Sequence, residues 1–149
     1  MFGSPQRGVN AYAKVGIETN IGSASPHALV IMLYDGAMTA IMKGLANMRM
    51  GNIAEKGRAI SHAITIIDNG LRASLDRDAG GQIASSLDSL YDYMSRQLLV
   101  ANLQNKPEIL EEVHRLLADL RGAWTSIGAT PAVAVAQNDV GRAPLMASA

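Results

Sequence analysis

The stretch SASPHALVIMLYDGA, residues 23–37, decides the fold because it starts a helix and carries more apolar surface than one buried stripe needs. Ser25 can accept a hydrogen bond from an unpaired backbone amide, and Pro26 suits the first helical position. Only two of the ten residues from Ala28 to Ala37 are not apolar. Such a helix can bury one face in a core and still present apolar side chains to a second surface.

Composition limits the class of protein to which the chain can belong. Its 149 residues fit one domain, which buries about 68–70% of its unfolded surface. The chain has no cysteine, which excludes disulfides, thiolate nucleophiles and cysteine metal sites. Lys and Arg number 13, as do Asp and Glu, which argues against a nucleic acid or an anionic membrane held mainly by charge. The N-terminus has no signal-peptide core and no apolar run is long enough to span a bilayer, so we expect a cytoplasmic protein without membrane insertion.

Apolar residues recur at helical spacing in four segments and do not alternate with a period of two. The expected helices run over about 26–49, from Asn52 to Leu75, from the turn at 76–81 to Ala101, and from Pro107 to Ile127. Short connections force each helix to run antiparallel to the last, and the spacing of 4,3,4,3 predicts crossing angles of about 20°. The fold class is therefore all-α, an antiparallel up-down four-helix bundle.

The ends of the second and third helices carry their own signals. Asn52 followed three residues later by Glu55 predicts the reciprocal hydrogen bonds of a capping box. The paired glycines and carboxylates of residues 76–81 favour a turn. We expect the buried stripe of the second helix to begin at Ile53 and that of the third at Ile83.

Three regions follow from this pattern. Residues 1–24 form a flexible N-terminal arm and cap segment, residues 25–127 form the bundle, and residues 128–149 form a disordered tail. The tail consists of Gly, Ala, Pro and single polar residues without a sustained period, which is why we expect no packed structure there.

Several motifs resemble, in order and at matching separations, the FliS family of flagellar export chaperones for flagellin. They extend over residues 11–127 and comprise Tyr12, Ile17 and Thr19, then SASPHALVIMLYDGA, ISHAITIIDNGLRASLD, GGQIASSLDSLYDYMSRQLLVANLQN and EEVHRLLADLRGAWTSI. The resemblance implies a cytoplasmic helical chaperone that binds the disordered C-terminal segment of newly made flagellin. It also implies that binding prevents premature polymerisation and assists delivery to the flagellar type III export gate, and it leaves room for other flagellar regulators as partners. A departure is the insertion of residues 20–23 before the Ala-Ser-Pro cap, which some members lack.

A client that folds on binding needs an apolar groove, and three sets of side chains are candidates for its lining. Methionines adapt to irregular partners, small residues let a second backbone approach closely, and tyrosines are frequent interface anchors. The methionines on the first helix are Met32, Met38 and Met42; the strip on the second helix is Ala59, Ala63, Ile66 and Gly70; the third helix contributes Tyr91, Tyr93 and Val100. The alternative is that the methionines fill core gaps and that the small residues pack internally. We expect the channel between the second and third helices to accept an amphipathic client helix.

The N-terminal arm is the candidate cover for such a surface. Tyr12, Val15, Ile17 and Ile21 are spaced as a short amphipathic helix or an extended strap. The resemblance implies that this segment caps an apolar groove and yields to flagellin, and an internal cover would limit aggregation. The alternative is that the arm is disordered.

Other function classes find less support. Glu111 and His114 have the Glu-x-x-His spacing of di-iron bundles, but that site needs a second such motif and two further inward glutamates. We expect no enzyme, no catalytic or metal-binding residue and no cofactor. Trp124 completes a seven-spaced stripe with Leu110 and Leu117, which indicates core, with a partner anchor as the alternative. A bundle that associates with itself as a structural or regulatory protein is the alternative function.

Overall fold

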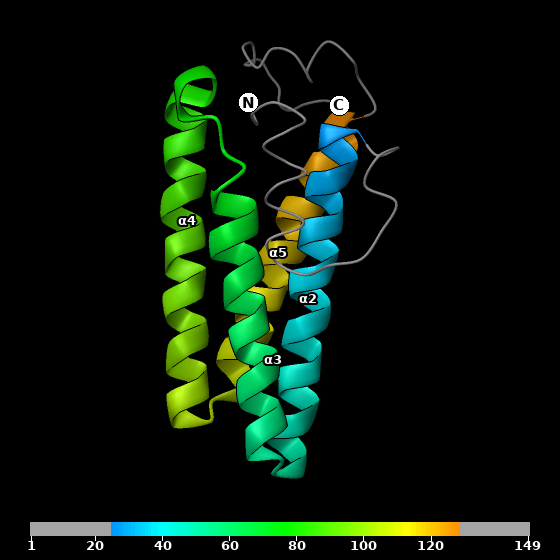
Figure 1. The fold of residues 1–149 in the computed structure, drawn as a ribbon, viewed down its shortest axis with the longest axis vertical. Helices are drawn as coiled ribbons and strands as arrows, with labels where there is room; N and C mark the ends of the chain where they lie inside the picture. The colour runs from blue at the N-terminus through cyan, green and yellow to red at the C-terminus, as the bar shows by residue number, and fades with distance from the viewer. Residues whose placement is uncertain (1–24, 129–149) are drawn as a thin grey trace.

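Local sequence signals start and stop each helix of the computed structural model, which describes residues 25–128. In this part of the chain four long antiparallel helical segments form a bundle, and β-strands are absent from it (Figure 1). The elements are α2 (Pro26–Met50), α3 (Ile53–Thr65) with its π-helical continuation η2 (Ile66–Arg72), α4 (Arg77–Gln104) and α5 (Pro107–Gly128). The prediction of an all-α four-helix bundle is confirmed. The predictions for the N-terminal arm, its cap residues and the C-terminal tail lie outside the described residues.

The first helix follows its sequence signals closely. Ser25 caps α2, since its side chain accepts a hydrogen bond from the amide of Ala28 at 3.1 Å. Gly51 ends α2 with a φ of 77°, a left-handed conformation that glycine adopts without strain. The face between these ends packs into the core and contributes nine buried residues, from Leu29 to Leu45.

The second helix departs from expectation at both ends. Asn52 makes no side-chain cap; its amide donates to Asn47, and Glu55 pairs with Arg58, so the predicted capping box was wrong. The expected single helix to Leu75 is instead α3 followed by seven residues of π-helix. A π-turn has more residues per turn than an α-turn, so this segment presents a broader set of side chains to its neighbours than an α-helix of equal length.

The third helix begins where the turn was expected, and it is interrupted once. The Asp76 carboxylate caps α4 by accepting from the amide of Ala79 at 3.0 Å. Gly81 then breaks the helical geometry with φ 53° and ψ −127°. The N-terminal part of α4 extends past the end of η2, as Figure 1 shows.

Predicted core positions near the starts of the second and third helices are exposed. Ile53 is 61% exposed and Ile83 is 60% exposed, so their assignment to the buried stripes was wrong. Ile53 is the first residue of α3 at one end of the bundle. Ile83 lies two residues after the Gly81 break in α4. In both cases the periodicity predicts the face of the helix on which the residue lies, but the described helices leave its side chain accessible.

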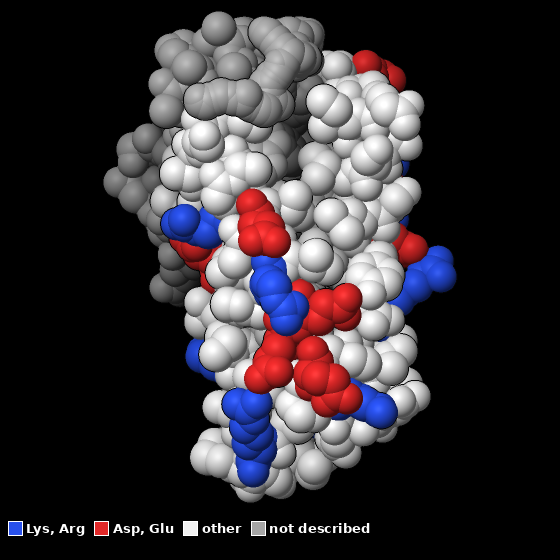
Figure 2. Space-filling view, turned by 180° about the vertical axis from the view of Figure 1, so that it is seen from behind, with Lys and Arg blue, Asp and Glu red and all other residues white. Residues whose placement is uncertain are grey.

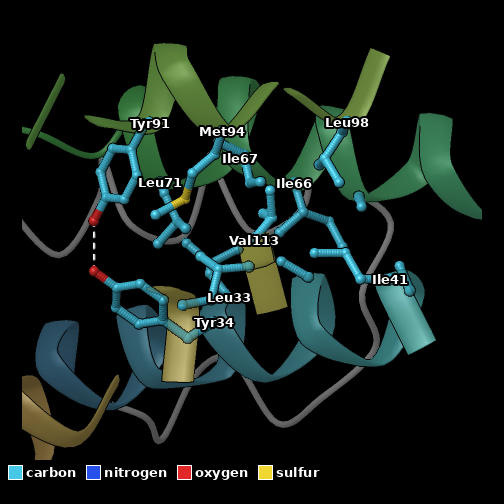
Figure 3. Packing of buried hydrophobic residues seen from close by; sticks show 14 of the residues in the cluster. Leu33, Tyr34, Ile41, Ile66, Ile67, Leu71, Tyr91, Met94, Leu98 and Val113 are labelled. Atoms are coloured by element: carbon cyan, nitrogen blue, oxygen red, sulfur yellow. Dashed lines mark hydrogen bonds between the residues drawn. The ribbon is translucent and has the colours of Figure 1, made fainter. Parts of the chain in front are cut away.

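The core is continuous along the bundle, and leucines, isoleucines and alanines dominate it. Figure 3 shows how side chains from α2, η2, α4 and α5 meet there, with Val113 of α5 among them. At one end the hydroxyls of Tyr34 and Tyr91 are 2.5 Å apart, and both side chains are fully buried. At the other end the buried Lys56 ammonium donates hydrogen bonds to the Asn102 carbonyl and the Asn105 side chain at 2.9 and 2.7 Å.

One helix, α2, is long and apolar enough to cross a membrane by length and composition alone. Half of the relevant window is buried inside the bundle. The core helix of a soluble protein meets the same criterion, so this property of α2 reflects its central position between α3 and α5.

Candidate partner-binding surfaces

A shallow cleft of about 330 Å³ lies between α2 and α3. Met32 and Ala59, two of the residues predicted to bind a partner, both line it. The other lining residues are Asp35, Gly36, Thr39, Ala40, Lys43 and His62. We call this feature the α2–α3 cleft; it has an apolar floor and a charged rim.

A second surface lies between α4 and α5, beyond the hydrogen bond from the Tyr93 hydroxyl to the Glu112 carboxylate at 3.1 Å. That bond fixes which faces of the two antiparallel helices meet. Counting from it in steps of three and four brings apolar residues of both helices onto this shared face. They are Ile83, Leu87 and Leu90 of α4 with Leu116, Leu120 and Ile127 of α5, and we call them the α4–α5 groove. Ile83 is exposed and the other five are half-buried, so the groove retains apolar surface that the described bundle leaves accessible.

The α4–α5 groove is also uncharged. Asp88, near its α4 side, turns away to Arg72 of η2, and Arg121 of α5 turns away to Asp35 of α2. Figure 2 shows charged residues gathered over the lower part of this face, and a hollow between uncharged residues above them. A partner of this groove is therefore selected by shape and apolar contact.

Sequence reasoning missed this groove because helical periodicity predicts that all six residues belong to the buried stripes of the third and fourth helices. The periodicity correctly predicts that they share one face of each helix. The one sequence signal of the groove was the pair Gly80-Gly81, which predicts a break in the helix close to Ile83. The pair does not predict how far α4 extends past η2.

The tyrosines of α4 have opposite environments. Tyr93 is 41% exposed, as expected for a partner anchor, and it lies at the closed end of the α4–α5 groove. The expectation that Tyr91 is half-buried and half wet was wrong, because Tyr91 is fully buried. Its hydroxyl finds a partner in Tyr34, which removes the penalty that a buried unpaired hydroxyl would carry.

Burial raises the pKa of the Tyr91 phenol above its ordinary value of 10.0. Burial also raises the pKa of Tyr34, with a smaller contribution from the neighbouring Tyr91. The Trp124 side chain hydrogen-bonds Tyr34, and since an indole has only a donor, Trp124 donates. Trp124 is half-buried and packs against the core, as predicted, and its carbonyl accepts from His27 Nε2.

The strip of small residues on the second helix lies inside the bundle. Ala63 and Ile66 have no exposed surface, Gly70 is buried, and only Ala59 reaches the α2–α3 cleft. This placement is the one that internal packing requires. A partner reaches Ala63, Ile66 and Gly70 only if α3 separates from its neighbours.

The remaining predicted residues lie apart from both surfaces. Six residues separate Met32 from Met38, so they point about 120° apart around α2. Met38 packs against the core, and Met42 is 48% exposed. Val100 is half-buried on α4, two turns beyond Tyr93 and away from the α4–α5 groove.

A charged cluster joins η2 to α4 on the side away from the groove. Arg72 Nε lies 3.0 Å from Asp88 Oδ1, and Arg72 Nη1 lies 3.4 Å from both Asp68 and Asp92. The hydrogen bond from Arg72 is the main reason that the pKa of the Asp88 carboxyl is lowered. These contacts pair the aspartates with arginines, which gives the cluster a structural role in holding η2 against α4.

The geometry around Glu111 and His114 is not that of a metal site. Glu111 accepts a hydrogen bond from Arg49 at 2.8 Å, and residues 25–128 contain no group of three His, Asp or Glu side chains able to hold a metal ion. The chemistry that the described surface offers is apolar contact.

The chain is similar to known proteins over most of its length. The profile of the family described as "Flagellar protein FliS" matches residues 8–131. A "Flagellar secretion chaperone FliS" of Salmonella typhimurium is 49% identical over 120 residues, which cover 80% of this chain and 89% of that protein. The Escherichia coli protein of the same name is 42% identical over 118 residues, covering 79% and 87%. The Bacillus subtilis protein is 30% identical over 107 residues, covering 72% and 78%.

Proposed function

Since the chain belongs to the FliS family of flagellar secretion chaperones, we propose that it binds the disordered C-terminal segment of flagellin and keeps it unpolymerised until export. The family implies a role in binding flagellar components rather than in catalysis. To this family role the proposal adds which segment of the client is bound, which surface receives it and what binding does to flagellar assembly. It also places the protein in the cytoplasm, where flagellin is synthesised, with delivery of the bound client to the type III export gate.

The observation that carries the proposal is the α4–α5 groove. It combines large, partly exposed apolar side chains with an absence of charged ones among its six residues. An amphipathic helix that folds on binding can lay its apolar face into such a groove, with anchors spaced three and four residues apart. The exposed Tyr93 at the end of the groove offers an aromatic anchor with a polar tip.

The α2–α3 cleft supports a second contact along the same client. Its apolar floor accepts a side chain, while Asp35, Lys43 and His62 on its rim can orient the backbone around it. The two surfaces involve all four helices, so a long disordered segment would have to wrap around the bundle to reach both. Wrapping of this kind is typical of segments that order on binding.

We also propose that the N-terminal arm covers part of this apolar surface until the client arrives, through Tyr12, Val15, Ile17 and Ile21. The arm joins α2 directly, and Met32 of the α2–α3 cleft lies only six residues, about 9 Å, beyond Pro26 along the helix. That cleft is therefore within reach of the arm.

Titration calorimetry with a peptide of the flagellin C-terminal region tests the proposal. We expect 1:1 binding with a micromolar or tighter Kd and a negative heat-capacity change, because apolar surface is buried as the peptide folds. Ile83→Asp should weaken binding at least about 10-fold, since it places a carboxylate in the groove. Ile53→Asp is the matched control, because Ile53 has the same side chain and almost the same exposure at the far end of the bundle.

Both substitutions are at exposed positions, so both variants should fold with wild-type helicity. Equal loss of binding in the two variants would remove the α4–α5 groove from the proposal. A flat titration of folded wild-type protein, accompanied by a mass that rises with protein concentration, would instead support the alternative of a self-associating bundle.

A further inference from the structure

We infer that the chain following α5 folds back into the α4–α5 groove and competes there with the client. The competition, but not the docking, rests on the function proposed above. The segment concerned, residues 129–136, has the sequence ATPAVAVA and lies outside the described residues. We call it the return segment. The family profile ends at residue 131, so most of the return segment belongs to this chain beyond its family match.

The exit point of the chain favours this occupant. The last described residue of α5 is Gly128, directly after Ile127, which is itself part of the groove. Pro131 disfavours helical geometry at Thr130 and cannot donate a backbone hydrogen bond, so the sequence ends the helix and permits a change of direction. The return segment is thus the first part of the chain after α5 that can reach the groove.

The distances allow the contact. Ile83 lies ten residues before Tyr93 on α4, and Gly122 lies ten residues after Glu112 on α5. Because the Tyr93–Glu112 bond aligns these antiparallel helices, Ile83 lies near the level of Gly122, about 8 Å along the axis from Ile127. Six extended residues reach about 20 Å, so Val133 can return to Ile83 with chain to spare.

The chemistry also matches. No charged residue occurs between positions 122 and 138, and Val133 and Val135 carry branched apolar side chains within a run of alanines. The six groove residues are uncharged as well. The N-terminal arm is the less suitable occupant of this groove, because its central part carries the charged residues Lys14 and Glu18.

Docking is tested without any client. The chain has no cysteine, so Val133→Cys in the full-length protein gives a single site for a nitroxide spin label. We expect paramagnetic broadening of the backbone amides of Ile83 and Leu87, with the amide of Ile53 at the far end unaffected. A label at Thr19→Cys in the arm is the matched control. Broadening of Ile83 from the arm label alone, or from neither label, would overturn the inference.

Competition is tested by removing the apolar contact of the return segment. The double variant Val133→Asp/Val135→Asp should bind the flagellin peptide several-fold more tightly, by about 10-fold if the segment is docked nine-tenths of the time. Val140→Asp adds a carboxylate beyond the segment and should leave affinity unchanged. Unchanged affinity in the double variant would overturn the competitive role.

The two proposals fail in different ways. If the flagellin peptide does not bind the wild type or the double variant, while the label on Val133 still broadens Ile83, docking stands and the flagellin proposal fails. If the peptide binds wild type and the label never broadens Ile83, the flagellin proposal stands and the return segment is not the occupant.

Discussion

At the scale of single residues, the buried tyrosine pair shows how one hydrogen bond changes what a side chain can do. Tyr91 was expected at an interface because of its polar tip, and it lies in the core because Tyr34 meets that tip. Tyr34 has two hydrogen-bond partners, Tyr91 and Trp124. Among the described residues, the Tyr91 hydroxyl bonds Tyr34. The two hydroxyls are therefore unequal.

We predict that Tyr34→Phe destabilises the fold more than Tyr91→Phe does. The first change leaves the buried Tyr91 hydroxyl unpaired, at a cost of about 1–3 kcal/mol, while the second leaves Tyr34 bonded to Trp124. The double variant should cost less than the sum of the two. Urea unfolding of all four proteins gives the double-mutant cycle, and strict additivity would contradict a direct bond between the hydroxyls.

The same pair predicts a loss of stability in alkali. Burial raises the pKa of both phenols above 10.0, so above that pH the folded protein retains protons that the unfolded chain releases. The stabilisation is complete below about pH 10 and falls as the pH rises, by up to about 1.4 kcal/mol per pH unit for each phenol. Unfolding free energies measured from about pH 8 to about pH 11 should fall more steeply for wild type than for the variant Tyr34→Phe/Tyr91→Phe, which retains the exposed Tyr93 as an internal control.

At the scale of elements, the contact between α2 and α3 depends on a glycine. A Cβ added at Gly44 would lie 2.9 Å from Ile60 Cγ1, which is too close, because Ile60 is fully buried and branched at Cβ. Gly57 of α3 has no heavy atom within 4 Å of an added Cβ. Gly44 is thus needed for the close approach of α2 and α3, whereas Gly57 is not needed for any close contact.

Gly44→Ala and Gly57→Ala should therefore shift stability in opposite directions. We expect Gly44→Ala to destabilise by about 1–3 kcal/mol through overpacking against Ile60. Gly57→Ala should stabilise by about 0.5–1 kcal/mol, because alanine loses less backbone entropy in a helix. Thermal unfolding of both variants is the measurement, and a stabilised Gly44→Ala protein would show that the α2–α3 contact is looser than described.

Element boundaries also decided which predictions succeeded. Ser25, which acts through its own local backbone, caps α2 as the sequence predicts. The continuation of α3 into η2 is different, because it depends on contacts with other helices. One of its faces is buried in the core, and Arg72 is held by aspartates of α4. A one-dimensional pattern cannot distinguish a π-turn from an α-turn when tertiary contacts determine which is formed.

At the scale of the whole molecule, the charges lie away from the surface that we assign to the client. The α4–α5 groove is uncharged, while the ion pairs join η2 to α4 and α5 to α2. The chain as a whole has equal numbers of acidic and basic residues. Association through this surface should therefore owe little to electrostatic steering.

Binding of the flagellin peptide should accordingly be insensitive to salt. We expect Kd to change less than about 2-fold between about 50 mM and about 500 mM NaCl, since screening acts on charges and not on apolar contact. Calorimetry at the two salt concentrations measures this. A Kd that rises 10-fold or more would point to the charged rim of the α2–α3 cleft as the principal contact.

The sequence by itself determined the helices, their order and antiparallel course, the cap at Ser25 and the family of the chain, because each depends on short-range spacing or on motifs of neighbouring residues. Only the tertiary structure decided which apolar residues remain accessible. Ile53 and Ile83 read as core and are exposed, and Tyr91 reads as surface and is buried. The physical reason is that the burial of a side chain depends on where the neighbouring helices lie and on which polar groups they place beside it. The periodicity of apolar residues along one helix gives no information about either.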